Sequence, residues 1–498
     1  MKLSSFASVL VFALALVATS CQQSPSTQTS TPTPAATRAA GITAADIPAG
    51  YGYPGDRAQI QGWADQWEIA KITQHTWDMW AGMTADSGQT DPDGSKLPYW
   101  ETWCGTADVF GGTCGKGVAR PSRPFRVPSQ FTHSAQLKGS SAPAPDTQVV
   151  SFNKFNPSMA QYLNAQHAGP GTGGPYNYTS VSSLIALNNA WPSGTATVDR
   201  KVEEAPYQPS TSSAPGFAGI ETKPVIFLVK ATGLTPMPLW QGPAGSTLPT
   251  APTPNTWTTC VLLDPANTGG PDVAPVLATP QQIAQAVAMP YACDKTKYLY
   301  APLSTIYSFK MNADEAASWN AVQKGVGGSG GTAAAGDYGV LGGMHVNSKE
   351  IINWTWQTFY WQPGPDTPNK FPGSKDGMTA NVKGPWRNYA SCSAYNQTQG
   401  NASTKMVVCF NPFLETATNA GIPDGLQSNC VSCHGTATVS GPPITNQNPP
   451  PSANPTTLPY PPDYKKPISF GQGGKPIDPR FAGFTRTDFS WAIPQNAQ

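Results

Sequence analysis

Two cysteines and a histidine near the C-terminus have the spacing of a haem-attachment site. The segment reads Cys430-Val431-Ser432-Cys433-His434, and C-x-x-C-H is the attachment motif of c-type haem. Thiols three positions apart lie on one helical turn. Both can form thioethers with the haem vinyl groups there, and the adjacent imidazole binds the iron as proximal ligand. We expect one covalent haem c, held by Cys430, Cys433 and His434.

Two other chemistries use paired cysteines, and the surrounding sequence favours neither. A redox C-x-x-C opens a helix after a strand in a βαβ unit, and no such pattern precedes Cys430. A structural zinc site takes four ligands, and the chain has no second C-x-x-C. Apart from Cys21, six further cysteines remain, an even set that is typical of disulfides in an oxidising compartment. Among the many pairings that six cysteines allow, sequence neighbours predict Cys104–Cys114, Cys260–Cys293 and Cys392–Cys409.

The sixth iron ligand must come from upstream, because none of the 64 residues after His434 is Met or His. Met344 and His345 follow Gly342 and Gly343 at the end of an expected strand, where glycines allow a cofactor to approach closely. Successive strand residues point to opposite faces, so only one of the two side chains faces the haem. We expect His345 as the distal ligand; Met344, another residue or an open iron remain the alternatives.

The other histidines and a run of aromatic residues have less specific interpretations. His75 is expected on the exposed side of its helix, and His133 and His167 on the surface of polar loops. One alternating set of side chains either walls a haem pocket or packs in the core: Ile352, Trp354, Trp356 and Tyr360.

The elements that position these residues are predicted to be short strands between loops rich in Pro and Gly. The chain has 48 Gly and 52 Pro, a content that interrupts helices and strands. Short runs of β-branched and aromatic residues predict strands at 225–229, 257–263, 305–311, 339–346, 351–361, 389–395 and 405–410. A helical period predicts a helix over 56–83. A capping box of Asn312 and Glu315 predicts a second helix, and Asp424 is the expected cap of the haem-attachment helix.

The N-terminus predicts export and a lipid anchor. Lys2 and an apolar run of 13 residues from Phe6 to Ala18 form a signal peptide, too short to span about 30 Å of hydrocarbon. Cys21 follows three small residues, as in the lipobox of bacterial lipoproteins, although Ala18 stands where a typical lipobox has Leu. By analogy with enteric lipoproteins, Gln22 after this Cys predicts the outer membrane, with the protein on the periplasmic side.

We therefore expect four segments and an α+β fold. Residues 1–20 are the lipoprotein signal peptide and 21–45 a disordered Ser/Thr/Pro tether. Residues 46–420 form a large, β-rich body with long Pro/Gly-rich loops. Residues 421–498 form the haem c attachment segment, with a cytochrome c-like attachment helix, a Pro-rich loop and a C-terminal helix.

Composition limits the partners. The net charge is only +1 and charged residues make up 12% of the chain, so the sequence lacks the basic excess by which proteins neutralise nucleic-acid phosphates. Nothing in the sequence identifies a redox partner protein or a small-molecule electron donor. We expect contact with the membrane through the N-terminal lipid anchor alone.

The sequence resembles the uncharacterised bacterial cytochrome c family proteins that carry a single C-terminal C-x-x-C-H. Besides the haem motif, the resemblance lies in segments 150–157 (VSFNKFNP), 343–346 (GMHV), 354–359 (WTWQTF) and 487–491 (TDFSW). In that family the Trp-x-Trp segment often continues Thr-Phe-Glu-His, whereas this chain has Tyr360 and Trp361 after Phe359. Any role of that Glu-His pair is therefore not carried over. The resemblance implies a c-type haem protein and no particular activity.

Three functions fit these observations. The first is electron transfer by a lipid-anchored, mono-haem cytochrome c. The second is a haem-dependent oxidoreductase, peroxidase-like or substrate-oxidising, with an open distal site. It remains an alternative because the body is much larger than a minimal electron carrier needs. The third is a structural or scavenging lipoprotein in which haem stabilises the fold. The sequence favours the first and assigns no catalytic residue.

Overall fold

The computed structural model describes residues 42–111, 114, 123, 125–126, 150–168, 175–191, 200–240, 259–289, 291, 293–325, 331–364, 373–415, 428–440, 466–471 and 475–493. By their internal contacts Met1–Ala36 and Thr37–Gln498 form two separate units, and all elements below belong to the second. Its mixture of helices and sheets confirms the α+β class. The signal peptide, Cys21, most of the tether and His133 lie outside the described residues. No helix in the described part is both long and apolar enough to cross a membrane.

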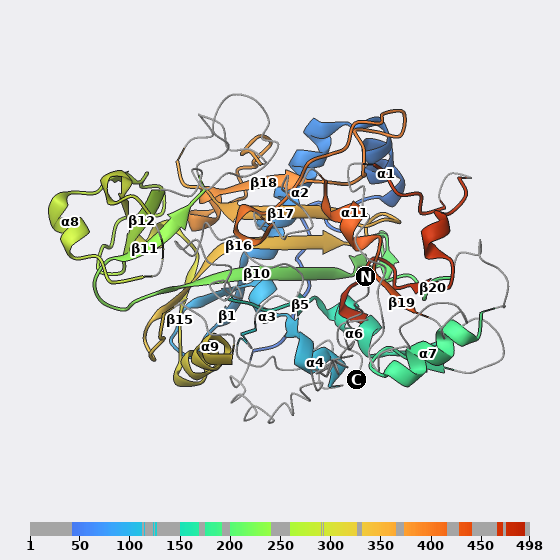
Figure 1. Ribbon diagram of the computed structural model, residues 1–498. Helices are drawn as coiled ribbons and strands as arrows, with labels where there is room; N and C mark the ends of the chain where they lie inside the picture. Colours follow the sequence, from blue (N-terminus) through green and yellow to red (C-terminus); the bar gives the residue numbers. More distant parts are fainter. Residues whose placement is uncertain are drawn as a thin grey trace, which may run out of the picture. The chain divides into compact units, whose positions relative to one another are not determined.

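An eight-stranded sheet forms the centre of this unit. Its main path runs β18-β17-β16-β10-β5-β3, with β15 on β16 and β4 on β10. The long strands β10 (Ile220–Val229) and β16 (Tyr338–Ser348) are antiparallel and almost entirely buried. The antiparallel strands β17 (Thr355–Trp361) and β18 (Tyr389–Ser393) extend the sheet from β16. These four strands follow one another across the centre of Figure 1.

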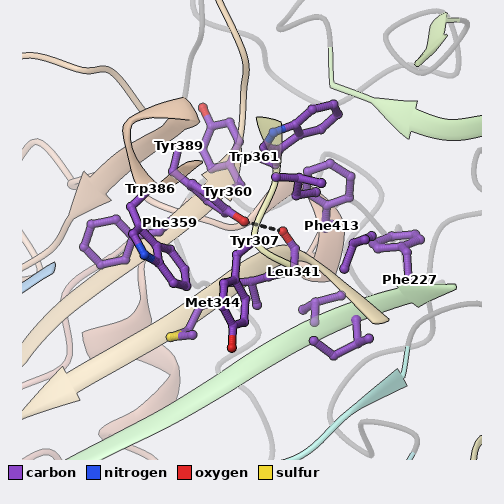
Figure 2. Packing of buried hydrophobic residues seen from close by; sticks show 14 of the residues in the cluster. Phe227, Tyr307, Leu341, Met344, Phe359, Tyr360, Trp361, Trp386, Tyr389 and Phe413 are labelled. Carbon is purple, nitrogen blue, oxygen red and sulfur yellow. Dashed lines mark hydrogen bonds between the residues drawn. The ribbon is translucent and has the colours of Figure 1, made fainter. Parts of the chain in front are cut away.

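Alternation along these strands gives the sheet two different faces. On one face Phe359 stacks on Trp80 of α2 (Ile69–Thr84) with 4.0 Å between ring centroids. Both belong to a large aromatic cluster, and Figure 2 shows the part of it around Phe359. Met344 is fully buried in the same cluster. On the other face Trp356 packs with the C-terminal residues Val431 and Phe489 in a second cluster. The predicted haem-attachment segment therefore packs directly on the sheet.

The predicted N-terminal helix is two helices. α1 covers Arg57–Gln66, and α2 begins at Ile69. Trp67 adopts a left-handed conformation (φ 59°) between them, and its N–H bonds to Trp63 O at the end of α1. The aromatic residues recur at helical spacing through both helices, and both helices bury part of that set. The spacing alone therefore did not reveal that α1 ends at Gln66. α9 (Ala313–Gly325) is confirmed with its capping box, in which Asn312 N–H donates to Glu315 Oε2 (3.0 Å) and Glu315 N–H to Asn312 Oδ1 (2.8 Å).

Most predicted strands are present, with three corrections. The runs at 225–229, 257–263, 339–346 and 389–395 correspond to β10, β12 (Thr259–Asp264), β16 and β18. Within 305–311 only β15 (Ser308–Lys310) is a strand, after the 3-10 turn η3 (Leu303–Thr305). The run 351–361 becomes a strand only at Thr355. The strand predicted at 405–410 is wrong, since this segment forms a single bridge between Met406 and Thr398.

A smaller sheet lies at one end of β10. Its order is β11 (Thr235–Leu239), β12, β14 (Leu299–Pro302) and β13 (Val276–Leu277), beside α8 (Pro280–Ala284). The remaining elements are short: β1 (Asp86–Thr90), β2 (Lys96–Pro98), α3 (Tyr99–Thr102), β3 (Cys104–Gly105), α4 (Thr106–Phe110), β4 (Val150–Ser151), β5 (Lys154–Phe155), α6 (Pro157–Asn164), β6 (Gln166–Ala168), β7 (Pro175–Asn177), α7 (Val181–Asn189), β8 (Tyr207–Gln208), β9 (Phe217–Ala218), η2 (Lys295–Lys297), η4 (Gly384–Asn388), α10 (Pro412–Glu415), α11 (Cys430–His434), β19 (Thr438–Ser440), η5 (Pro479–Phe481) and β20 (Phe484–Arg486).

All three predicted disulfides are confirmed. Cys104–Cys114, Cys260–Cys293 and Cys392–Cys409 have Cα–Cα distances of 6.1, 5.6 and 5.7 Å. Among the described residues the free cysteines are Cys430 and Cys433. The eight described cysteines thus form three disulfides and one pair of thiols on a single helical turn.

Candidate haem-attachment site

The motif Cys430–His434 forms the short helix α11. Its N-cap is Asn429, whose side-chain oxygen accepts a bond from Ser432 N–H (3.2 Å). The Asn429 amide also donates to the carbonyls of Gln397 (3.0 Å) and Val407 (2.8 Å). One buried residue therefore begins the helix and ties it to the body. The expectation that Asp424 caps this helix is wrong, because the helix begins only at Cys430; Asp424 itself lies outside the described residues.

The two thiols of α11 are protonated at neutral pH. Burial, and next the Glu415 charge, raise the pKa of Cys433 to about 12 and that of Cys430 well above its usual value. Redox-active C-x-x-C dithiols instead depend on a lowered thiol pKa. The environment of α11 therefore does not favour a thioredoxin-like dithiol. In the part of the chain that is described, no cluster of three or more His, Cys, Asp or Glu side chains has the geometry of a metal site.

His434 is a neutral imidazole whose Nδ1 is hydrogen-bonded to the backbone. Its Nδ1 lies 3.0 Å from Phe489 O, so Nδ1 carries the proton and donates it to this carbonyl. Burial lowers the pKa of His434 to about 3, which leaves the Nε2 lone pair available to a metal. The Trp356 ring packs on the imidazole with 4.2 Å between centroids. These contacts fix the ring and its tautomer, as expected of a ligating histidine.

Gly435 ends the helix where no side chain fits. A Cβ at this position would lie 2.1 Å from the Phe470 ring. Phe470 also packs edge-on against Phe489, with 4.9 Å between centroids. The glycine after His434 therefore lets the aromatic layer close over the end of α11.

His345 and Met344 point to opposite faces of β16, as predicted. His345 lies beside Lys223 of β10 and Thr358 of β17 in the strand register, on the face that carries Trp356. Its Nε2 is 3.2 Å from Glu415 Oε1, and its buried Nδ1 has no hydrogen-bond partner among the described residues. Positive charge on His345 lowers the pKa of His434, so the two imidazoles lie within electrostatic range.

The glycines before Met344 make room for protein side chains and not for the expected cofactor. A Cβ at Gly343 would lie 2.6 Å from Asn411 Nδ2. The Asn411 amide donates to Thr358 Oγ1 (2.8 Å) and Phe359 O (3.0 Å). Asn411 N–H also donates to Glu415 Oε2 (2.7 Å). The close approach at Gly343 therefore positions Glu415 beside His345. On the other side, a Cβ at Gly342 would meet the Phe227 ring at 2.5 Å.

Sequence reasoning missed the charged residues around α11. Burial lowers the pKa of Lys223 to about 7, Arg126 lowers it further, and Glu415 and Cys433 act in the opposite direction. Arg126, Glu415 and Cys433 therefore lie within electrostatic range of Lys223, although they are far from it in sequence. One signal was available: Lys223 is the one cation in β10 and stands directly before the apolar run 224–229.

The interpretations of His75 and His167 as exposed residues are wrong. His75 is buried, with Nδ1 2.6 Å from Tyr395 Oη and Nε2 3.3 Å from Glu350 Oε1. His167 is buried beneath Tyr178, with ring centroids 3.9 Å apart, and its Nε2 is 2.7 Å from Tyr162 O. Both histidines are therefore held by structural partners of their own.

The four alternating residues that were expected to share one strand face lie in different environments. Trp356 packs in the cluster that holds α11, whereas Tyr360 belongs to the large aromatic cluster with Phe359. Ile352 is exposed in the turn before β17, and Trp354 is buried in a left-handed conformation. Within this set, the Trp356 ring packs on the motif residue His434. Comparison with protein-family models, curated proteins and solved structures found no match for this chain.

Proposed function

We propose that this chain is an exported, mono-haem c-type cytochrome lipoprotein that acts in electron transfer. The single observation that carries the proposal is the state of α11. It presents two free thiols on one turn next to a neutral imidazole whose Nδ1 is committed to Phe489 O. This arrangement provides two thioether positions and one axial nitrogen, which suits haem c.

Bound haem would supply one-electron chemistry at its iron. Cys430 and Cys433 would hold the porphyrin covalently, and His434 would bind the iron through Nε2. Trp356, Phe470 and Phe489 exclude water from the proximal side, since all three are buried around α11. A low-dielectric, rigid surrounding of this kind limits the reorganisation that accompanies electron transfer.

Export and anchoring are part of the same proposal. Three disulfides support an oxidising compartment, the compartment type in which covalent haem attachment takes place. The lipobox-like sequence ending at Cys21 supports an anchor that holds the protein on the periplasmic side of the outer membrane. The resemblance to bacterial cytochrome c family proteins is compatible with this location.

One observation favours the second candidate, a haem-dependent oxidoreductase. Nε2 of His345 is already engaged by Glu415 at 3.2 Å. A histidine oriented by a carboxylate near an open iron has the groups for general acid–base catalysis. In that case His345 would transfer protons to and from a bound substrate and would not ligate the iron.

The attachment experiment compares two double variants. Cys430→Ala with Cys433→Ala is expected to abolish haem staining after denaturing electrophoresis. Cys392→Ala with Cys409→Ala removes a neighbouring disulfide and is expected to keep covalent haem in the protein that folds. Staining that survives in the first variant, or a wild-type protein without covalent haem, contradicts the proposal.

Carbon monoxide separates the two candidates. A six-coordinate electron carrier is expected to keep its reduced absorption spectrum when CO is added. An open distal site is expected to bind CO rapidly and shift the spectrum.

A further inference from the structure

The carbonyl that accepts the His434 proton lies in a strained turn. Among the described residues other than glycine, a positive φ occurs at Trp67, Trp354, Asp488 and Phe489. Asp488 (φ 48°) and Phe489 (φ 66°) are consecutive. A left-handed conformation costs an L-residue roughly 1–2 kcal/mol, so surrounding contacts must impose it. Strain of this kind concentrates at functional sites, and here it accompanies the bond from Phe489 O to His434 Nδ1.

A buried lysine holds the first residue of this turn. Lys349 Nζ donates to Asp488 Oδ1 at 2.7 Å, and the side chains are 0% and 6% exposed. The other carboxylate oxygen, Oδ2, accepts a bond from Ala205 N–H at 2.7 Å. Asp488 is thus bonded through both oxygens. Because Lys349 directly follows β16, the turn is attached to the central sheet.

A second contact holds the other end of the turn. Ser490 Oγ donates to Glu221 Oε1 of β10 at 2.6 Å. Within the turn, Thr487 Oγ1 donates to Ser490 O at 2.8 Å. Phe489 therefore lies between two residues that are each bonded to the sheet, which leaves its carbonyl little freedom to move.

The same lysine also organises the turn that leads to Trp356. Lys349 Nζ donates to Ile352 O at 2.7 Å and lies 5.7 Å from the centre of the Trp354 ring. Trp354 has φ 63°, and two residues later Trp356 packs on the His434 ring. Lys349 thus links two turns that contact His434. One precedes Trp356, whose ring packs on the imidazole, and the other contains Phe489, whose carbonyl accepts the bond from Nδ1.

We propose that Lys349 is a positioning residue for His434: through Asp488 it holds the Phe489 carbonyl on Nδ1, and thereby sets the electron donation from Nε2. Only the effect on the reduction potential rests on the proposed function; the positioning of His434 does not. A bond from Nδ1–H to a carbonyl fixes the tautomer and raises the basicity of the ligating nitrogen. Stronger donation from the axial ligand favours the oxidised iron and lowers the reduction potential.

The first experiment needs no haem. In the full-length Cys430→Ala/Cys433→Ala protein, ¹⁵N NMR of the histidines is expected to show His434 in the Nδ1–H tautomer. Adding Lys349→Met is expected to shift His434 towards the Nε2–H tautomer, whereas Lys349→Arg keeps a cation and retains Nδ1–H. Lys230→Met is the matched control, because Lys230 is paired with Asp337 in an ion pair that shares no residue with this network.

The second experiment measures the midpoint potential of the haem-loaded protein with intact Cys430 and Cys433. Lys349→Met is expected to raise the potential, and Lys349→Arg and Lys230→Met are expected to leave it near the wild-type value. A His434 tautomer and a potential that both remain unchanged in Lys349→Met overturn the inference.

Lys349→Met leaves the Asp488 carboxylate buried without its cation and can prevent folding. A further variant tests the inference in that case. Lys349→Met/Asp488→Gly removes both charges, and glycine adopts a left-handed backbone without strain. It is expected to show the same tautomer shift and the same rise in potential, and wild-type behaviour refutes the role of Lys349. A wild type without covalent haem would refute the proposed function alone, because the NMR experiment tests the positioning independently.

Discussion

His345 is the residue on which the two candidate functions differ. Its Nε2 lies beside Glu415 and its buried Nδ1 has no partner among the described residues, so the side chain still has an unused nitrogen. If His345 is the distal ligand, His345→Ala is expected to convert a low-spin absorption spectrum to a high-spin one while the thioethers retain the haem. The loss of one axial imidazole leaves the iron five-coordinate or bound to water.

Met344→Leu is the control for this change. Met344 is fully buried on the opposite face, and a swap of similar volume costs less than about 1.5 kcal/mol. The spin state is expected to remain unchanged. A low-spin spectrum that persists in His345→Ala, or a methionine-to-iron charge-transfer band in the wild type, assigns the sixth position to another residue.

Glu221 predicts a pH-dependent contribution to stability. Burial raises the pKa of this carboxyl from 4.5 to about 7, the Asp488 charge adds to the rise, and bonds from Ser490 and Asn347 oppose it. The folded chain therefore holds this proton more tightly than the unfolded chain. The favourable contribution is full below about pH 4.5 and is lost as the pH rises towards about 7.

The comparison is with Glu221→Gln, which cannot ionise. The free energy of unfolding of the wild type, relative to that of the variant, is expected to fall between about pH 4.5 and pH 7 and to level off above. Urea unfolding of both proteins at several pH values measures this difference. Parallel stability curves for the two proteins would show that Glu221 ionises normally in the folded state.

Among the elements, α11 depends most on one residue. Asn429 caps the helix and satisfies two carbonyls of the body. Loss of a cap costs about 1 kcal/mol, and each buried carbonyl left without a donor costs about 1–3 kcal/mol. Asn429→Ala is expected to destabilise the protein by at least about 3 kcal/mol, the sum of one cap and two carbonyls at the lower end of these values, measured by denaturant unfolding.

Asn429→Ser separates the two roles. Serine caps a helix about as well as asparagine, but its hydroxyl cannot donate to both Gln397 O and Val407 O. Its cost is expected to lie between those of the wild type and the alanine variant. If serine restores full stability, the two carbonyl bonds contribute little.

For the whole molecule, the predicted anchor decides where the protein is found. Cys21→Ser removes the thiol that the lipid would modify, and no helix in the described part of the chain is long and apolar enough to cross a membrane. This variant is expected to move from the membrane fraction to the soluble periplasmic fraction, as detected by immunoblot after fractionation. Full membrane retention of the variant would show that the protein is held by something other than a lipid on Cys21.

The sequence by itself determined features that depend on near neighbours. The thiol spacing of Cys430 and Cys433 follows from the helical repeat, and the Asn312–Glu315 capping box from a three-residue separation. The disulfides were predictable because each joins cysteines that are adjacent in the order of the chain. Strand alternation placed Met344 and His345 on opposite faces.

Tertiary structure alone decided the partners of these residues. Lys349, Asp488 and Glu221 are widely separated along the chain, and their sequence neighbours carry no pattern that pairs them. They meet because the register of β10 against β16 places Glu221 opposite Asn347, near Lys349, and because the turn at 487–490 packs on α11. The contacts of His75, His167 and Gly343 were mispredicted for the same reason. A short stretch of sequence indicates whether it forms a helix, strand or turn, whereas its burial and hydrogen-bond partners depend on which distant elements pack against it.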